Sequence, residues 1–280
     1  YRKRRRNKAE NQIFEVLIMI PKKIHYCWFG GAEKSSLIKK CITSWKKICS
    51  DYEIIEWNES NFDLNCCDYV REAYEAKKWA FVSDYARFWI LYHKGGIYFD
   101  TDVEIIKPLN EILKQGAFLG CETRYTVAPG LGMAANPGLG IYKEMLDFYE
   151  KRHFRNQNGA IDTTTIVTYT TQILVQHGWK PDREIQTVEG ITIYPPEYFC
   201  PMNYKSGELN ITKNTRTIHH YAASWYGKTD KQIAAINKKC IERFGVNVGQ
   251  KVSAVLVLPF RLKRKLEYNG YNGIMKSKNQ

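Results

Sequence analysis

The sequence predicts an α/β domain, and three observations lead to that fold class. The chain has 280 residues, of which 44% are hydrophobic and 25% charged, a composition typical of a globular protein with a sizeable core. Short apolar segments typical of strands alternate with segments whose apolar residues recur at helical spacing. Glycine pairs at 30–31 and 95–96 separate several of these segments. Alternation of this kind indicates strands covered by helices.

Each element in the first half of the chain follows from these patterns. In chain order, we expect a strand at 20–29, a helix over 37–48, a strand at 52–57, a polar helix or loop over 67–79, a helix over 80–94, a strand at 97–99, an extended stretch over 103–106 and a strand at 118–122. The helix over 80–94 is apolar nearly all round, which predicts burial, and Gly95 ends it.

The second half is less regular. We expect a glycine-rich loop over 130–140, a helix over 140–152, and strands at 191–194 and 217–221. Residues 163–176 are rich in threonine and β-branched residues, and their pattern fits a helix or a strand. Beyond Gly245, the segment 252–266 combines an apolar patch with a basic cluster.

The net charge of +13 belongs to the two ends of the chain. Residues 1–8 carry +6 and residues 261–280 carry +5, which leaves +2 for residues 9–260. A nearly neutral body argues against a nucleic-acid partner. We therefore expect a basic extension at 1–18, disordered or added to the natural domain, then a domain over 19–240 and a basic C-terminal segment at 241–280.

Cysteine spacing and hydropathy bear on the compartment. Eight scattered cysteines form no C-x-x-C pair, which favours a reducing cytoplasm over secretion. No apolar run approaches the ~18 residues that a membrane-spanning helix requires. We expect a cytoplasmic protein. An apolar patch followed by basic residues fits a C-terminal segment that contacts an anionic inner membrane peripherally. Because Pro259 interrupts a continuous helix, a strand or short helix packed on the domain with a solvated tail is the alternative.

The sharpest chemical feature is the pair Asp100 and Asp102 at the end of a predicted strand. Side chains two apart on an extended chain project to one side, so the two carboxylates would concentrate negative charge there. Hard oxygen ligands of this kind suit Mn²⁺ or Mg²⁺, with substrate phosphates completing the coordination. A solvated turn is the alternative interpretation of an isolated D-x-D.

Two further charges lie on the apolar helix that precedes this strand. Asp84 and Arg87 are three residues apart and therefore share a helix face. They form either a structural ion pair or part of a binding site, because buried charges are costly unless they are paired or bind something polar.

These segments resemble a known family. The run from Ala80 to Phe88 and the run from Leu91 to Asp102 are similar to the signature A-x-x-S-D-x-x-R followed by L-x-x-x-G-G-x-Y-x-D-x-D of glycosyltransferase family 32, the sugar transferases whose sugar-binding region contains a DXD motif. That family includes α-mannosyltransferases and capsular polysaccharide enzymes and is related to the catalytic domains of clostridial glucosylating toxins. The resemblance, over residues 19–225, implies a GT-A fold with a mixed central sheet flanked by helices.

The resemblance also implies roles for individual residues. By it, the nucleotide base lies near Ile24, His25 and Trp28, the donor sugar and phosphate are held by Asp84 and Arg87, the ribose or sugar hydroxyls meet Asp100, and the metal binds Asp102. A late segment resembles the family's H-H-x-x-x-S-W element, which implies that Ser224 and Trp225 close over the diphosphate. Of His219 and His220, only one can face the metal from a strand, and we expect His219.

From these residues we expect a metal-dependent, retaining glycosyltransferase of the hexosyltransferase class. The donor would be a nucleotide sugar, a UDP-sugar in preference to GDP-mannose, and the acceptor a glycan or lipid-linked glycan of bacterial surface polysaccharide synthesis. A metal-dependent phosphodiester hydrolase is an alternative, although such enzymes usually use more histidine and aspartate ligands. A nucleic-acid-binding protein and an inactive sugar-binding relative are further alternatives, and Asp100 and Asp102 argue against the second.

Overall fold

The structure is a computed structural model, and it describes residues 19–182, 184–204, 206–222 and 228–263. The chain divides into two compact units. The first unit comprises Tyr1–His153, Thr163–Pro201 and Ile211–His220, and the second comprises Phe154–Asp162, Met202–Asn210 and Tyr221–Gln280. The predicted boundary between residues 240 and 241 falls inside the long helix of the second unit.

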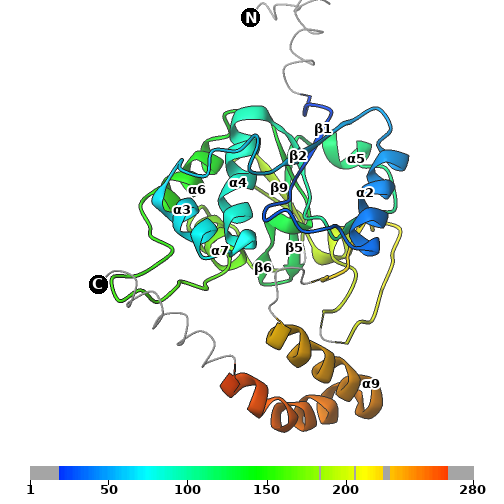
Figure 1. Ribbon diagram of the computed structural model, residues 1–280. Coiled ribbons are helices and arrows are strands. Elements are labelled where there is room, and N and C mark those ends of the chain that lie inside the picture. Colours follow the sequence, from blue (N-terminus) through cyan, green and yellow to red (C-terminus); the bar gives the residue numbers. More distant parts are fainter. Residues whose placement is uncertain (1–18, 183, 205, 223–227, 264–280) are drawn as a thin grey trace, which may run out of the picture. The chain divides into compact units, whose positions relative to one another are not determined.

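The first unit alternates helices and strands along the chain (Figure 1). Its elements are β1 (Lys23–Cys27), α2 (Ser36–Ile48), β2 (Glu53–Trp57), α3 (Asp68–Glu75), α4 (Trp79–Lys94), β3 (Gly96–Tyr98), β4 (Val103–Ile105), α5 (Asn110–Leu113), β5 (Ala117–Thr123), β6 (Thr126–Val127), the 3₁₀-helix η1 (Pro129–Leu131), β7 (Met133–Ala135), α6 (Gly140–Glu150), α7 (Ile166–Gln176), β8 (Gln186–Val188), β9 (Ile191–Tyr194), α8 (Pro196–Phe199) and β10 (Thr217–His219).

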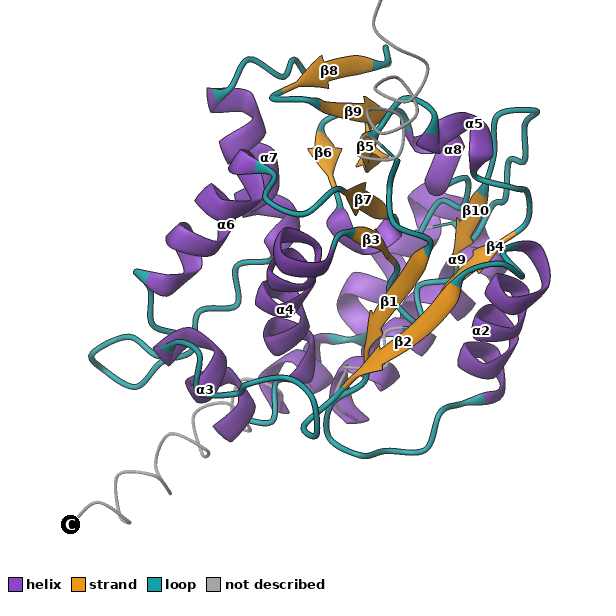
Figure 2. Cartoon of the chain, turned by 90° about the horizontal axis from the view of Figure 1, so that it is seen from above, coloured by secondary structure: helices purple, strands orange, loops and turns teal. Residues whose placement is uncertain are grey.

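A mixed sheet forms the centre of the first unit. Among the described residues its strand order is β2-β1-β3-β7-β5-β9-β8, with β6 paired to β5. The pairs β1–β2, β1–β3 and β5–β9 are parallel and the others are antiparallel. Figure 2 shows α4, α6 and α7 on one side of this sheet and α2, α5 and α8 on the other. The prediction of an α/β fold with a mixed central sheet flanked by helices is confirmed.

Strand direction determines where the loops that follow the strands meet. Because β2, β1 and β3 are parallel, the residues after each strand lie at the same edge of the sheet. Trp28 follows β1, and Asp100 comes two residues after the end of β3. In open α/β sheets, ligands bind beyond the carboxyl ends of the strands, so this edge is where a site is expected.

Helix α4 is the buried helix predicted from the sequence. It packs against α3 and α6, where the Phe88 and Tyr142 rings lie 5.2 Å apart. Gly95 ends the helix with φ of 63°, and Gly96 follows with φ of 100°. Two consecutive residues in this left-handed region turn the chain directly from α4 into β3. The short connection fixes the carboxyl end of β3 relative to α4.

The prediction of a loop over 130–140 is wrong in its central part. Residues 133–135 form β7, a fully buried strand between β3 and β5 in the middle of the sheet. Its sequence, Met-Ala-Ala, contains no β-branched or aromatic residue, so the usual strand signal is missing. Residues 163–176, which fitted a helix or a strand, contain helix α7.

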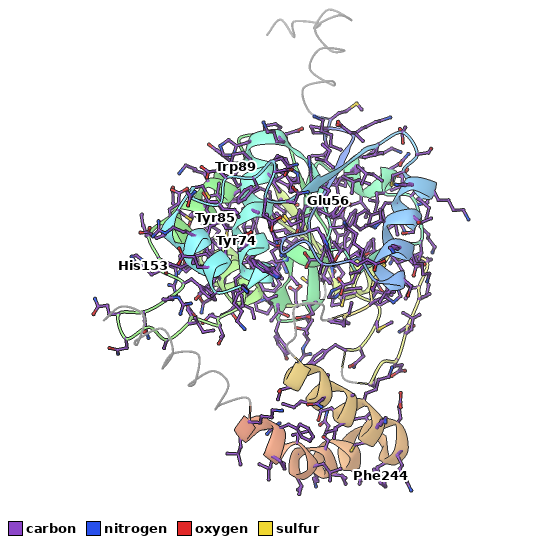
Figure 3. All side chains as sticks on the ribbon, viewed as in Figure 1. Glu56, Tyr74, Tyr85, Trp89, His153 and Phe244 are labelled. Carbon is purple, nitrogen blue, oxygen red and sulfur yellow. The ribbon has the colours of Figure 1, made fainter. Side chains whose placement is uncertain are left out.

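The second unit is dominated by α9 (Lys228–Leu256). Gly245, with φ of 73° and ψ of 169°, divides it into two helical runs, and Phe244 lies at that bend (Figure 3). The runs approach closely at Gly249, where an added Cβ would lie 2.5 Å from the Cys240 carbonyl oxygen. Among the described residues, every helix falls short of the length and hydropathy that a membrane span needs.

Candidate active site

Asp100 and Asp102 lie in a tight turn and not on an extended chain. The Val103 N–H donates to the Asp100 carbonyl oxygen at 3.1 Å, which closes the turn directly after β3. The prediction that both carboxylates project to one side of an extended strand is therefore wrong. Asp100 turns toward α4, while Asp102 contacts β10.

The Arg87 guanidinium is surrounded by acceptors of the first unit. Its Nη2 lies 3.0 Å from Asp84 Oδ1 and 3.2 Å from Asp100 Oδ1, and its Nε donates to the Ser83 carbonyl oxygen at 3.0 Å. Its face lies 5.1 Å from the centre of the Tyr98 ring. Only 4% of the Arg87 side chain is exposed, whereas 32% of the Asp100 side chain is. Arg87 is thus placed to orient Asp100, and Asp100 presents the accessible charge.

Burial and charge shape the ionisation of this cluster. Burial raises the pKa of Asp84 to about 7, although Arg87 beside it lowers that pKa and Asp100 adds to the increase. Burial would lower the pKa of Arg87, but Asp100, Tyr98 and Asp84 more than offset that effect and raise it. Arg87 therefore remains a cation between the carboxyl groups of Asp84 and Asp100.

Gly130 packs closely against Asp100. The Asp100 N–H donates to the Gly130 carbonyl oxygen at 3.0 Å. A Cβ atom added at Gly130 would lie 1.9 Å from Asp100 Oδ2 and 3.1 Å from Arg87 Nη1. The φ of Gly130 is outside the left-handed region, so close approach and not backbone conformation accounts for a glycine here.

The two consecutive histidines contact different carboxylates. His219 Nε2 lies 3.2 Å from Asp102 Oδ1. His220 Nε2 lies 2.7 Å from Glu104 Oε2, which also accepts from Lys40 Nζ at 2.8 Å. The structure therefore brings His219, the residue favoured from the sequence, to the metal candidate Asp102. Burial alone would lower the pKa of His219, but Asp102 raises it to about 10, so the protonated ring pairs with the carboxylate.

The Asp102 and His219 donors fit a small divalent cation. Cis ligands at about 2.1 Å from a metal stand about 3.0 Å apart, close to the 3.2 Å between Asp102 Oδ1 and His219 Nε2. A cation bound there would replace the proton that now bridges the pair. Among the described residues no group of three or more such ligands occurs, so water and phosphate oxygens would complete the coordination.

The residues expected near a nucleotide base occupy β1 and the turn after it. Ile24 and His25 are fully buried in the sheet, while Trp28 is half-buried and its indole N–H donates to the Ala32 carbonyl oxygen at 2.7 Å. Lys34 Nζ lies 5.2 Å from the centre of the Trp28 ring. Of the three, Trp28 presents a partly accessible ring at the carboxyl edge of the sheet, and the contact with a base stays a prediction.

His25 is held as one tautomer by two scaffold contacts. The Trp57 indole N–H can only donate, so the 3.0 Å contact makes His25 Nδ1 the acceptor and leaves the proton on Nε2. That Nε2–H donates to the Gly95 carbonyl oxygen at 3.0 Å. Burial lowers the pKa of His25 from 6.5 to about 4, partly opposed by the Gly95 carbonyl. A second proton on His25 Nδ1 would point at the Trp57 indole N–H, so the contact would be lost.

We expect the free energy of unfolding to fall by about 3 kcal/mol between pH 6.5 and pH 4 through His25 alone. The unfolded chain binds the extra proton from pH 6.5 downward, whereas the folded chain takes it up only near pH 4. Denaturant unfolding at a series of pH values measures this dependence. His25→Gln, which cannot titrate in this range, should flatten the curve, and equal slopes for the two proteins would refute the assignment.

Some predicted residues lie beyond the described ranges, and some site residues escaped prediction. Ser224 and Trp225 fall within 223–227, outside the described residues. Sequence reasoning missed Gly130, Tyr98 and Glu104. The glycines at 130 and 132 were the available signal for a close approach, and Tyr98 stands inside the D-x-D signature run.

Comparison with known proteins gives the class of this region. Residues 35–119 match the family model described as "Glycosyltransferase sugar-binding region containing DXD motif". That match covers less than half of the chain and includes Asp84, Arg87, Asp100 and Asp102. It identifies this segment as a glycosyltransferase-type region.

A search of curated proteins gave no match. Two similar solved structures are glycosyltransferases by their titles. One is "PaToxG Glycosyltransferase", at 19% identity and a TM-score of 0.42, covering 60% of this chain and 77% of that one. The other is a glycosyltransferase involved in the glycosylation of the major capsid of PBCV-1, at 13% identity and a TM-score of 0.42, covering 72% of this chain and 94% of that one. Similarity at this level says nothing further about what this chain does.

Proposed function

We propose that this chain is a metal-dependent, retaining glycosyltransferase of the GT-A type that uses a nucleotide-sugar donor. One observation carries the proposal: Asp84, Arg87 and Asp100 form a single ion-pair cluster beyond the carboxyl end of β3, inside the segment that matches the DXD family model. Asp102, two residues further on, pairs with His219. An exposed carboxylate beside a candidate metal-binding pair suits a substrate that carries both hydroxyl groups and phosphates.

Asp100 would accept hydrogen bonds from hydroxyl groups of the donor. Its carboxylate is held by Arg87 and by the Tyr98 hydroxyl, which donates to Oδ1 at 3.2 Å, and about a third of the side chain remains exposed. Because its supporting contacts come from β3 and α4, the carboxylate would be oriented before the donor binds. Asp84 anchors Arg87 from the other side.

Asp102 and His219 would hold a divalent cation, Mn²⁺ or Mg²⁺. When bound, such a cation supplies positive charge to the diphosphate of the leaving nucleotide. The chain's own contribution is to hold a carboxylate oxygen and an imidazole nitrogen at the spacing of two adjacent ligands. The neighbouring His220 contacts Glu104, which also accepts from Lys40, so His220 is not part of this pair.

The chemistry of transfer fits this arrangement. As the nucleoside diphosphate leaves, the anomeric carbon gains oxocarbenium character, which a nearby carboxylate such as Asp100 stabilises. Arg87 holds that carboxylate in place. Retention of configuration would follow from attack on the same face that the leaving group vacates. We propose a UDP-sugar in preference to GDP-mannose, with Trp28 beside the base.

We propose a glycan or lipid-linked glycan acceptor in bacterial surface polysaccharide synthesis, and a cytoplasmic location. The pattern of scattered cysteines favours a reducing compartment. The resemblance of the central motifs to capsular polysaccharide enzymes supports the acceptor class.

Donor hydrolysis by the full chain tests this function. A panel of UDP-glucose, UDP-galactose, UDP-N-acetylglucosamine and GDP-mannose is incubated with Mn²⁺, Mg²⁺ or EDTA, and release of nucleotide and sugar is measured. We expect release from at least one donor with metal and none with EDTA, and the sugar is expected first as the anomer present in the donor. Turnover of a simple phosphodiester without turnover of any nucleotide sugar would instead establish the hydrolase.

A further inference from the structure

The second run of α9 carries an apolar stripe on its exposed side. Val248, Val255 and Leu262 are 55%, 66% and 64% exposed. They are spaced seven residues apart, which is close to two helical turns, so they lie on one side of the helix. The helical path continues beyond Leu256, because the Val257 N–H donates to Ser253 and the Arg261 N–H donates to Val257, both at 2.9 Å.

The opposite side of the same run is buried. Gly249, Ser253 and Val257 are buried there, at spacings of four. Gly249 lies against the Cys240 carbonyl of the first run. The second run therefore has one buried side, and its packing does not use the exposed stripe. An exposed apolar stripe of this length needs a different explanation.

The segment that carries the stripe is basic. Between residues 246 and 263 the sequence has three basic residues, Lys251, Arg261 and Lys263, and no acidic one. Lys251 and Lys263 are exposed and lie on opposite edges of the stripe, given the 100° turn per residue of a helix. Long lysine side chains at such edges can bury their stems and keep their ammonium groups in the polar layer.

We propose that this stripe, Val248, Val255 and Leu262, docks onto the surface of a bilayer that contains anionic phospholipid. The apolar side chains would enter the boundary between headgroups and acyl chains, with Lys251 and Lys263 among the phosphates. Pairing of the stripe with a second copy would bring the basic edges of both copies together, so like charges oppose that alternative. The helix would lie in the plane of the interface. This docking does not depend on sugar transfer.

Flotation of the full chain with vesicles tests the proposal. Vesicles of phosphatidylcholine alone are compared with an equal mixture of phosphatidylcholine and phosphatidylglycerol. We expect the chain to float with the mixed vesicles and not with phosphatidylcholine alone. The double variant Val255→Asp, Leu262→Asp should lower the partition coefficient at least roughly tenfold, because charge replaces buried apolar surface. Lys251→Gln and Lys263→Gln should each lower it about fivefold.

A matched control separates the stripe from general charge effects. Val175→Asp adds one negative charge, half of what the double variant adds, at a valine that is 45% exposed on α7, and it should leave flotation unchanged. Because the stripe is exposed, its variants should keep the wild-type circular dichroism. The basic residues of 1–18 and 264–280 are present in every variant, so they cannot account for a difference between variants.

Two results would overturn the proposal. Flotation of the Val255→Asp, Leu262→Asp variant at the wild-type level would assign binding to the basic ends of the chain. Sedimentation of the wild type as a dimer that Val255→Asp converts to a monomer would make the stripe an interface between copies. Donor hydrolysis without vesicles should be the same in wild type and stripe variants, so the outcome is independent of the proposed reaction.

Discussion

Asp102→Asn should reduce metal-dependent donor turnover by at least roughly 10², which corresponds to about 3 kcal/mol of transition-state stabilisation. The change keeps the shape of the side chain but removes the charge that pairs with His219 at 3.2 Å. An amide is a poor ligand for Mn²⁺ compared with a carboxylate. Release of nucleotide from the best donor, followed at increasing Mn²⁺ concentration, measures the loss.

The two neighbouring histidines supply a matched control for this experiment. His219→Gln should raise the Mn²⁺ concentration that gives half-maximal turnover, because its ring is the second donor beside Asp102. His220→Gln changes the adjacent residue, whose ring contacts Glu104 at 2.7 Å, and should leave that concentration close to the wild-type value. Full turnover of Asp102→Asn in the presence of EDTA would show that the pair holds no metal.

Gly130→Ala should lower donor turnover roughly 10²-fold while the protein still folds, since a displacement of about 1 Å at a reacting group can cost that much. The new methyl group would stand 1.9 Å from Asp100 Oδ2, so the carboxylate has to rotate away from its present position. That rotation would also disturb its 3.2 Å contact with Arg87. Steady-state donor hydrolysis and thermal unfolding should be measured together.

Gly140→Ala is the matched control for this change. Gly140 begins α6, and a Cβ added there would meet no atom within 4 Å. The φ of both glycines is outside the left-handed region, so neither substitution strains the backbone. Gly140→Ala should leave turnover and stability near the wild-type values. If Gly130→Ala behaved in the same way, the position of Asp100 would not matter for the reaction.

Periodicity in the sequence was sufficient to predict the elements that carry the site. Helix α4 is long, apolar on nearly every face and followed by two glycines. The sequence therefore predicted both the burial of the helix and the residue at which it ends. Strand β7 could not be predicted, because Met-Ala-Ala has no strand preference of its own and pairs with β3 and β5 on either side. Tertiary pairing determined that element, and local propensity did not.

In the candidate site, residue spacing in the sequence predicted contacts within one helix but not contacts between different helices and strands. The i,i+3 spacing predicted the contact of Asp84 with Arg87, because both lie on α4. The contact of Arg87 with Asp100 lies between elements and depends on how β3 packs against α4. The close approach of Gly130 depends on how η1 packs against the turn after β3, and no local sequence pattern predicts such a distance.

The pairing of β10 with β4 has a consequence for the order of assembly. Glu104 and His220 are separated by 116 positions, and β10 brings the adjacent His219 to Asp102 only when it pairs with β4. Asp102 is therefore synthesised early, and His219 only after most of the chain has left the ribosome. A cation shared by the two segments would act as a reversible cross-link that closes a long loop, which stabilises the folded chain at the expense of the unfolded one. A partly made chain would lack this link, so the nascent protein would be slow to acquire the capacity to consume its donor.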